Sequence, residues 1–259
     1  MKKKQTAEYI VNWLRTYAET NNMNGFIVGV SGGIDSALTS TLCAITGMPT
    51  LLVEMPIHQA QSQVVLAQKH ISFLENRFEN VSSVRVDLTA SFDTLVQSFP
   101  PSENEADYNL SLANSRARLR MTTLYYFAGI YKYLVAGTGN KVEDFGVGFF
   151  TKYGDGGVDL SPIADLTKTD VYSLAESLGI HEEILKAVPT DGLFGDERSD
   201  EDQLGASYAE LEWAMEYDGN GDKITKRERE VLVIYQKLNR LNQHKMLPIP
   251  VCAITDDLR

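Results

Sequence analysis

The alternation of apolar and polar positions predicts strands and helices that follow one another along the chain. Residues 26–30 (FIVGV) and 50–54 (TLLVE) are short runs dominated by apolar side chains, as in strands buried inside a parallel sheet. Further strands are predicted at 83–87 and 133–136. Apolar residues at helical spacing predict helices around 10–17 and over 36–46, 62–78, 110–132, 169–178, 206–217 and 225–244. This alternation predicts an α/β fold in which helices cover both faces of a parallel sheet.

Three stretches carry no regular pattern. Residues 100–107 hold two prolines and three acids and predict a mobile surface loop after a short helix at 91–98. Residues 144–168 are rich in glycine, and residues 190–203 are rich in acids and predict a further loop. No internal repeat or low-complexity tract divides the sequence, and its length predicts one large domain or two small ones.

Composition and charge narrow the classes of protein. Hydrophobic residues make up 43% and charged residues 23% of the chain, which is an ordinary globular balance. The formal net charge is -11, and so acidic a surface predicts no binding to nucleic acid or to anionic membranes. Cys43 and Cys252 form neither a metal-ligand spacing nor a disulfide framework, as in proteins of reducing compartments. With neither a signal-peptide pattern nor a run of ~18 apolar residues, we expect a cytoplasmic protein.

The sequence GVSGGIDS joins the first predicted strand to the helix that follows it. In open α/β sheets, ligands bind at the carboxyl ends of the strands. Two adjacent glycines let the backbone approach a ligand and turn several N–H groups towards it, and the helix adds the positive end of its dipole. Ser31 and Ser36 add hydroxyl donors. We therefore predict a phosphate-binding loop made of Gly29, Val30, Ser31, Gly32, Gly33, Ile34, Asp35 and Ser36.

Asp35 distinguishes this loop from the common phosphate-binding motifs. An unpaired carboxylate beside a polyphosphate repels it, so a divalent cation is expected between the two. No lysine follows the glycines, so the loop is not the GxxxxGK[ST] motif, and it does not fit GxGxxG either. The residues alone thus predict a polyphosphate site that contains a divalent cation.

SGGIDS resembles the pyrophosphate-binding loop of the ATP pyrophosphatases, which form an adenylate before a nitrogen or sulfur nucleophile displaces AMP. Within that group, further strings resemble the ammonia-dependent NAD synthetases, in the same order over roughly residues 6 to 250. The most specific of them is FFTKYGDGG. The strings are NSRARLRM at 114–121, GTGNKVE at 137–143, FFTKYGDGGVD at 149–159, LTK at 166–168, PT at 189–190 and HK at 244–245.

The resemblance implies a fold and a reaction. The fold is the Rossmann-like sheet of the adenine nucleotide alpha hydrolase class. The reaction is the last step of NAD biosynthesis, in which a ligase amidates nicotinic acid adenine dinucleotide (deamido-NAD) with ammonia. The nicotinate carboxylate attacks the α-phosphorus of ATP, which releases pyrophosphate, and ammonia then displaces AMP from the adenylated intermediate. The resemblance thus implies ATP as co-substrate and Mg²⁺ as cofactor.

The resemblance also implies roles for individual residues. Asp35 and Glu143 would ligate Mg²⁺, while Asp35 and Lys168 would act in catalysis. Thr138, Lys168 and Thr190 would join the loop in binding ATP. The deamido-NAD substrate would be bound by Arg118, Lys152, Asp159, His244 and Lys245.

The predicted helix at 110–132 is interpreted as an interface element. Arg118 shares one helical face with Asn114, while Arg116 and Arg120 share another and are expected at the surface or at an interface. The family forms homodimers with the substrate site at the interface, so the resemblance implies the same here. The density of aromatic residues on this helix suits both core packing and such an interface: Tyr125, Tyr126, Phe127, Tyr131 and Tyr133.

Two other classes of function remain open. Another member of the pyrophosphatase group is possible, but a tRNA-modifying thiolase should have a basic surface or paired cysteines, which the sequence lacks. A module that binds ATP without turnover would not require Asp35, Glu143 and Lys168 together. Because 259 residues leave no room for a fused glutaminase domain, ammonia is expected either free or from another protein.

Overall fold

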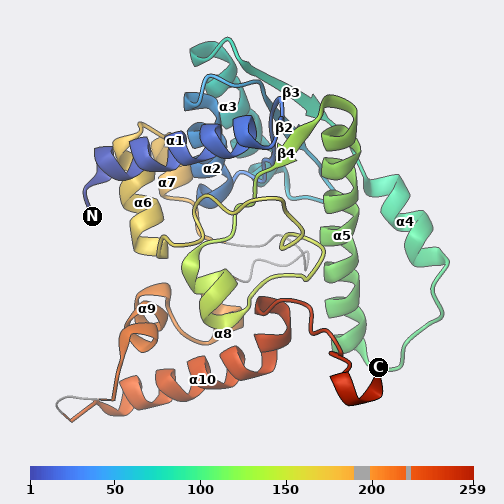
Figure 1. Ribbon diagram of the computed structural model, residues 1–259, viewed down its shortest axis with the longest axis vertical. Coiled ribbons are helices and arrows are strands. Elements are labelled where there is room, and N and C mark those ends of the chain that lie inside the picture. Colours follow the sequence, from blue (N-terminus) through green and yellow to red (C-terminus); the bar gives the residue numbers. More distant parts are fainter. Residues whose placement is uncertain (190–198, 220–222) are drawn as a thin grey trace.

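A computed structural model of the chain describes residues 1–189, 199–219 and 223–259. Four parallel strands form its central sheet in the order β3-β2-β1-β4 (Figure 1). They are β1 (Gly25–Gly29), β2 (Thr50–Glu54), β3 (Val81–Arg85) and β4 (Tyr133–Val135). The predicted α/β class is confirmed. Because the chain moves to opposite sides of β1 for β2 and β4, the sheet has its topological switch point beside β1, where such sheets bind ligands.

One face of the sheet packs against the N-terminal helices. Successive side chains of β1 alternate in direction, so Phe26 and Val28 are buried on this face, together with Leu52 of β2. The helices that share this core are α1 (Lys3–Thr20), α2 (Ile34–Ile45), α3 (Gln61–Arg77), α6 (Lys168–Ser177) and α7 (Glu182–Leu185).

The opposite face packs against α4 (Thr89–Gln97) and the long helix α5 (Glu105–Tyr131). Ile27 and Val53 point to this side and are fully buried, together with Phe92 of α4. Helices therefore cover both faces, as the two strongly apolar strands predict.

A third apolar cluster lies below the sheet in Figure 1 and involves only elements after β4. Val142 and Leu211 are fully buried there. The elements that form it are η1 (Val142–Val147), a short π-helical segment, and the helices α8 (Asp200–Leu204), α9 (Tyr208–Glu216) and α10 (Lys226–Met246). A short 3₁₀ turn, η2 (Asp256–Leu258), ends the chain.

Two of the predicted loops are wrong in part, because side chains cap helices inside them. Helix α5 begins at Glu105, within the stretch 100–107, since the Asn104 side chain accepts hydrogen bonds from the backbone N–H groups of Ala106 at 3.1 Å and Asp107 at 3.2 Å. Helix α8 likewise begins inside the stretch 190–203, where Ser199 and its partner three residues later form a capping box. The rest of that stretch, 190–198, lies outside the described residues.

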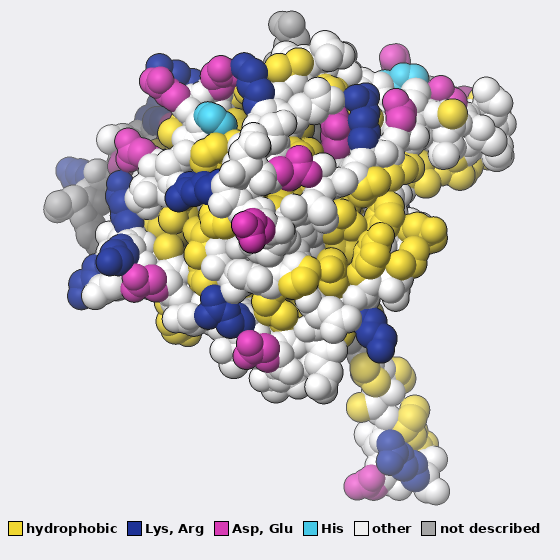
Figure 2. All heavy atoms as spheres, turned by 90° about the horizontal axis from the view of Figure 1, so that it is seen from above, with side chains coloured by type: hydrophobic (Ala, Val, Ile, Leu, Met, Phe, Trp, Pro, Cys, Tyr) yellow, Lys and Arg dark blue, Asp and Glu magenta, His cyan; other side chains and the backbone are white. Residues whose placement is uncertain are grey.

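The surface carries charges of both signs. On the face shown in Figure 2, Lys and Arg side chains are scattered among Asp and Glu, with apolar areas between them. Across the described part of the chain, no helix combines the length and hydropathy that crossing a bilayer requires.

Candidate active site

The loop at 29–36 leaves the carboxyl end of β1 and enters α2. Its bend requires glycine at position 32, where φ is +89° and a Cβ atom would lie 2.7 Å from the backbone oxygen of Gln63 on α3. The hydroxyls of Ser31 and Ser36 lie 3.2 Å apart, and Ser31 Oγ also accepts from the Gly33 N–H at 3.2 Å. These bonds hold the loop open at the start of α2, with the positive end of the helix dipole behind it.

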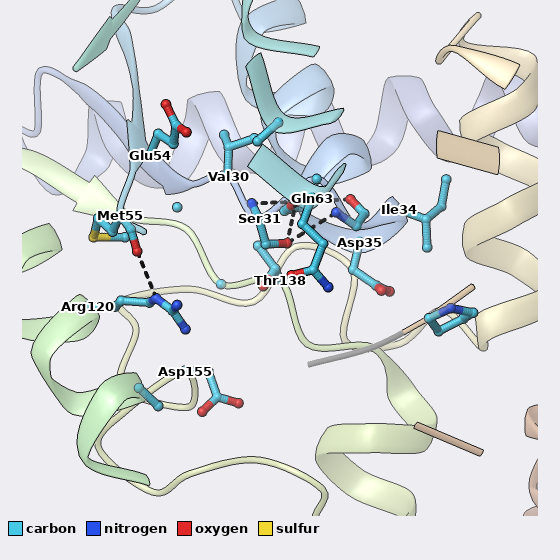
Figure 3. A pocket seen from close by; sticks show the side chains of 18 of the residues that line it. Val30, Ser31, Ile34, Asp35, Glu54, Met55, Gln63, Arg120, Thr138 and Asp155 are labelled. Atoms are coloured by element: carbon cyan, nitrogen blue, oxygen red, sulfur yellow. Dashed lines mark hydrogen bonds between the residues drawn. The ribbon is translucent and has the colours of Figure 1, made fainter. Parts of the chain in front are cut away.

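This loop forms one wall of a cavity of about 300 Å³ at the switch point of the sheet (Figure 3). Arg120 and Asp155 lie across the cavity from Ser31 and Asp35, and Met55 and Glu54 extend from the end of β2. The cavity is lined by all eight loop residues and by Thr138, Glu143 and Lys168. Eleven of the residues singled out in the sequence for ATP or metal binding therefore meet at one place.

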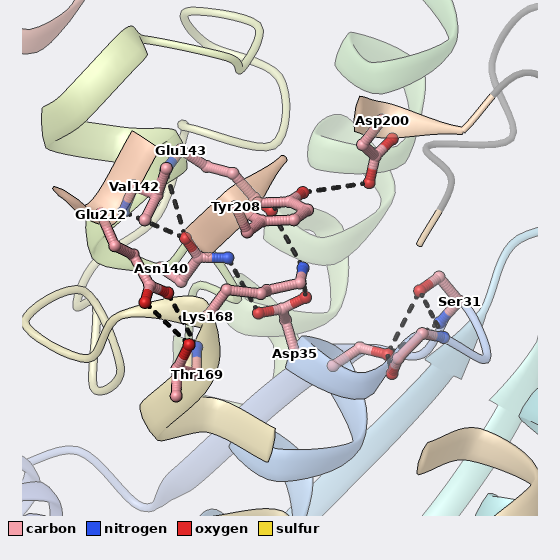
Figure 4. A network of polar contacts seen from close by, with 12 residues as sticks. Ser31, Asp35, Asn140, Val142, Glu143, Lys168, Thr169, Asp200, Tyr208 and Glu212 are labelled. Carbon is pink, nitrogen blue, oxygen red and sulfur yellow. Dashed lines mark hydrogen bonds and ion pairs between the residues drawn. The ribbon is translucent and has the colours of Figure 1, made fainter. Parts of the chain in front are cut away.

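Lys168 lies at the base of this cavity between two carboxylates (Figure 4). Its Nζ is 2.6 Å from Asp35 Oδ2 and 3.0 Å from Glu143 Oε1, and the lysine is only 3% exposed. Burial lowers the pKa of the ammonium, but the fields of Asp35 and Glu143 outweigh burial and the pKa is raised. Lys168 is therefore a fixed positive charge in the cavity, beside the loop at 29–36.

Asn140, to which the sequence assigns no role, aligns these carboxylates. It is fully buried, and its Nδ2 donates to Asp35 Oδ1 at 3.0 Å. Its Oδ1 accepts from the backbone N–H groups of Val142 at 3.1 Å and Glu143 at 3.2 Å. Its place in the string GTGNKVE is a signal that could have identified it, but a bond to Asp35 spans 105 positions of the sequence.

Two further acids near the cavity have perturbed pKa values. Burial, followed by repulsion from Glu143, raises the pKa of Asp144 to about 8. Asp155 is exposed in the cavity wall, but the protein around it partly desolvates the carboxylate and raises its pKa, while the Thr151 N–H donates to it at 2.9 Å and opposes the rise. An accumulation of acids around one buried lysine is a site that attracts cations.

The residues assigned to the dinucleotide lie outside the cavity lining, and four of them form a separate group. Lys152 Nζ donates to the backbone oxygen of His244 at 2.7 Å, and Lys245 Nζ donates to that of Phe150 at 2.7 Å. Arg118 donates to the backbone oxygen of Lys152 at 3.3 Å. This group joins α5, the glycine-rich segment and the end of α10.

Asp159 and Arg120 occupy other places. The Asp159 carboxylate accepts from Tyr125 Oη at 3.0 Å and from the Val135 N–H at 2.8 Å, so it fastens β4 to α5. Arg120, expected at the surface or an interface, instead lines the cavity and donates to the backbone oxygen of Met55 at 3.1 Å. That expectation is wrong because the face of α5 that carries Arg120 turns towards the sheet. Thr190 lies outside the described residues.

Comparison with known proteins identifies the family. The model of the family described as NAD synthase matches residues 6–247. An NH(3)-dependent NAD(+) synthetase from Carboxydothermus hydrogenoformans is 37% identical over 243 residues, which cover 93% of this chain and 94% of that protein. The chain belongs to the NAD synthase family. The predicted resemblance is thereby confirmed.

Solved structures of this family share the fold. An NMN synthetase from Francisella tularensis superposes with a TM-score of 0.86 at 28% identity, over 98% of this chain and 100% of that one. An NH3-dependent NAD synthetase from Campylobacter jejuni superposes with a TM-score of 0.78 at 23% identity, over 98% of this chain and 100% of that one. The second likeness concerns the fold alone.

Proposed function

We propose that this chain is an ammonia-dependent NAD synthetase, a ligase that amidates deamido-NAD to NAD and converts ATP to AMP and pyrophosphate through an adenylated intermediate. One observation carries the proposal. This chain belongs to the NAD synthase family, and its loop at 29–36 lines the same cavity as the Lys168–Asp35–Glu143 cluster. The relative from Carboxydothermus hydrogenoformans is named an NH(3)-dependent NAD(+) synthetase.

The loop end of the cavity suits the triphosphate of ATP. Backbone N–H groups and a helix N-terminus attract anions, and Thr138 and Lys168 line the same space. When the substrate carboxylate attacks the α-phosphorus, negative charge grows on the departing pyrophosphate, and the Lys168 ammonium stabilises it. Thr190, outside the described residues, is proposed to complete the ATP site.

The residues around Lys168 also suit Mg²⁺, which commonly binds one or two carboxylates together with substrate phosphates. Asp35 and Glu143 supply such a pair, and Lys168 Nζ stands between them in the place of a cation. Among the residues whose structure is described, no group of three or more His, Cys, Asp or Glu side chains forms a metal site. The remaining ligands would therefore be phosphate oxygens, and the ion would neutralise charge on the leaving group.

The dinucleotide is proposed to bind across a homodimer interface, through Arg118, Lys152, Asp159, His244 and Lys245. Their position beside the cavity, rather than in its lining, supports a site that a second subunit completes. Helix α5 supports the interface, since its large apolar side chains Leu110, Tyr126, Ile130 and Tyr131 are exposed. A partner seated there would also exclude water, which competes with ammonia for the adenylated carboxyl group.

The proposal includes a compartment and a domain organisation. Cys43 is buried and Cys252 is exposed, and both are free, which supports a reducing, cytoplasmic location. We propose that residues 1–259 act as one synthetase domain that takes ammonia itself as the nitrogen donor, as the names of the curated relatives state for those proteins.

A second candidate function is amidation of the mononucleotide, which gives NMN. The structural similarity to the Francisella tularensis NMN synthetase favours it, because the two chains superpose over almost their whole lengths. Both substrates present the same nicotinate carboxylate, so the chemistry at Lys168 is shared. The two functions differ in whether an adenylate half of the substrate must be bound.

One assay separates these functions. The purified chain is incubated with ATP, Mg²⁺, ammonium and either deamido-NAD or deamido-NMN, and AMP is measured with the amidated product. Formation of NAD together with AMP supports the NAD synthetase. A kcat/KM that is higher for deamido-NMN than for deamido-NAD would instead support the second candidate function. An Asp35→Asn variant, which keeps the side-chain shape, should lose Mg²⁺-dependent turnover in either case. AMP without an amidated product contradicts both functions.

A further inference from the structure

Helix α9 contacts the Lys168–Asp35–Glu143 cluster through Tyr208 (Figure 4). Tyr208, at the start of α9, is 5% exposed, and its hydroxyl lies 2.6 Å from Glu143 Oε1 and 3.3 Å from Asp200 Oδ2. A hydroxyl has one proton, so the shorter contact is the hydrogen bond that it donates. The Tyr208 ring covers the Lys168 ammonium, with Nζ 4.6 Å from the ring centroid, as in a cation–π contact.

One turn farther along the same face, Glu212 holds the first turn of α6. Its carboxylate accepts from the Thr169 N–H at 2.9 Å and from Thr169 Oγ1 at 2.7 Å. Thr169 follows Lys168 directly, so this pair fixes the backbone from which the lysine side chain extends. Two residues of α9 thus restrain both ends of Lys168, its backbone and its ammonium.

We propose that Tyr208 and Glu212 are positioning residues, which hold Glu143 and Lys168 in the orientation that nucleotide binding requires. Neither side chain lines the cavity, so their action passes through Glu143, Lys168 and Thr169. This inference rests on the proposed function, and in particular on a cation held by Asp35 and Glu143.

The contacts of the Glu143 carboxylate explain how the restraint works. Oε1 accepts both from Tyr208 and from Lys168. Within the described ranges, no hydrogen bond reaches Oε2, so the second oxygen is available to a cation. The Tyr208 hydroxyl donates to Oε1 at 2.6 Å and so fixes the side of the carboxylate that faces away from the cation. Removing such a hydrogen bond to a metal-binding carboxylate typically costs about 10- to 100-fold in metal affinity or activity.

Tyr208→Phe tests the hydroxyl while keeping the buried ring. Binding of Mn²⁺ is followed by the loss of the free-ion EPR signal, in the presence of a non-hydrolysable ATP analogue, and amidation is measured in parallel. We expect the Kd for Mn²⁺ to rise roughly 10-fold or more and kcat to fall by a similar factor, while the KM for the nicotinate substrate changes less than about 3-fold. Tyr217→Phe, at the other end of α9, is the matched control and should match the wild type.

Glu212→Gln tests the second contact, since it keeps one acceptor oxygen and removes the charge. We expect a fall in kcat of roughly 3- to 10-fold with the Mn²⁺ affinity close to that of the wild type, because Glu212 contacts Thr169, next to Lys168, and does not contact Glu143. Unchanged Mn²⁺ binding and kcat in folded Tyr208→Phe protein would overturn the proposal, as would a wild-type chain that binds no Mn²⁺. Because the EPR titration needs no turnover, a wild-type chain that binds Mn²⁺ and makes no amide would disprove the proposed function alone.

Discussion

At the scale of single residues, the phosphate loop depends on one backbone conformation. Gly32 and Gly47 both have positive φ, at +89° and +76°, but only Gly32 packs against another backbone. A Cβ at Gly32 would lie 2.7 Å from the Gln63 oxygen, whereas a Cβ at Gly47 would meet nothing within 4 Å. Substitutions at the two glycines therefore allow the cost of backbone strain to be measured separately from the cost of a steric clash.

We expect Gly47→Ala to lower the free energy of unfolding by about 1 kcal/mol, the strain of a positive φ. Gly32→Ala should lower it by roughly two to three times as much and should weaken ATP binding at least roughly 10-fold, because either the loop or α3 must shift. Urea denaturation and a nucleotide-binding titration check both values. Equal losses of stability in the two variants would show that the approach of α3 is unimportant.

Lys168 carries the second prediction at this scale. Lys168→Ala removes the charge between Asp35 and Glu143 and should slow formation of the adenylate by roughly 100-fold or more, as for loss of one transition-state donor. Rapid-quench measurement of pyrophosphate release in the first turnover checks it. The control is Lys3→Ala, which breaks an exposed ion pair between Lys3 of α1 and Glu176 of α6, the helix that begins with Lys168. It should leave the burst of pyrophosphate unchanged. A normal burst in Lys168→Ala would exclude this role.

At the scale of elements, α3 is fastened to α2 by a buried histidine. Ser40 Oγ donates to the backbone oxygen of Ser36 at 2.7 Å, so it accepts from His70 Nε2 at 2.9 Å. The other ring nitrogen, Nδ1, is buried and has no hydrogen-bond partner in the described structure. Burial, with a smaller contribution from the charge of His181, lowers the pKa of His70 to about 4. Protonation of His70 therefore opposes the folded state.

The sign of the resulting pH dependence follows from this pKa. Because the unfolded histidine titrates near 6.5, the unfolded chain binds more protons than the folded one between pH 6.5 and about 4. The contribution of His70 to stability is complete above pH 6.5 and falls by about 3 kcal/mol as the pH drops to 4. Chemical denaturation across this range should show that the free energy of unfolding falls less steeply with decreasing pH in His70→Gln than in the wild type. His181→Asn should keep most of the wild-type slope, and identical slopes in all three proteins would refute the assignment.

At the scale of the whole molecule, α5 connects the cavity to an exposed apolar face. Arg120 of α5 lines the cavity, while Tyr126 and Ile130 of the same helix are 63% and 55% exposed. Large apolar side chains gathered on an exposed face are typical of a protein interface. A second subunit packed on α5 would thus contact the same helix that contributes Arg120 to the cavity.

If the proposed homodimer packs through α5, the double variant Tyr126→Asp/Ile130→Asp should dissociate it, because two buried carboxylates at an apolar interface are strongly unfavourable. Light scattering coupled to size exclusion gives the mass, and steady-state assays should show a KM for deamido-NAD raised roughly 10-fold or more. Tyr9→Asp on α1, at a residue 72% exposed, is the control for adding charge to an exposed tyrosine. A wild-type monomer with full activity would contradict the proposed interface.

The sequence by itself determined the class of fold and most of the residues that meet in the cavity beside the loop at 29–36. Buried parallel strands appear in the sequence as short apolar runs. The glycines and Asp35 of the loop lie within a few residues of one another, so the sequence indicates their chemistry without knowledge of tertiary contacts. The loop follows β1 and Thr138 follows β4 at the same edge of the sheet, and Glu143 of η1 and Lys168 at the start of α6 meet them in the cavity. Family membership, expected from the strings after residue 114, is confirmed by the match over residues 6–247.

Only the tertiary structure decided which side chains orient that site. Asn140 reaches Asp35 across 105 positions, and Tyr208 reaches Glu143 across 65, distances over which no local pattern carries a signal. The direction of the α5 faces depended on packing against the sheet, which brought Arg120 into the cavity. The physical reason is that hydropathy and backbone propensity act over a few neighbouring residues, whereas a buried polar group is satisfied by whichever partner the folded chain brings within reach.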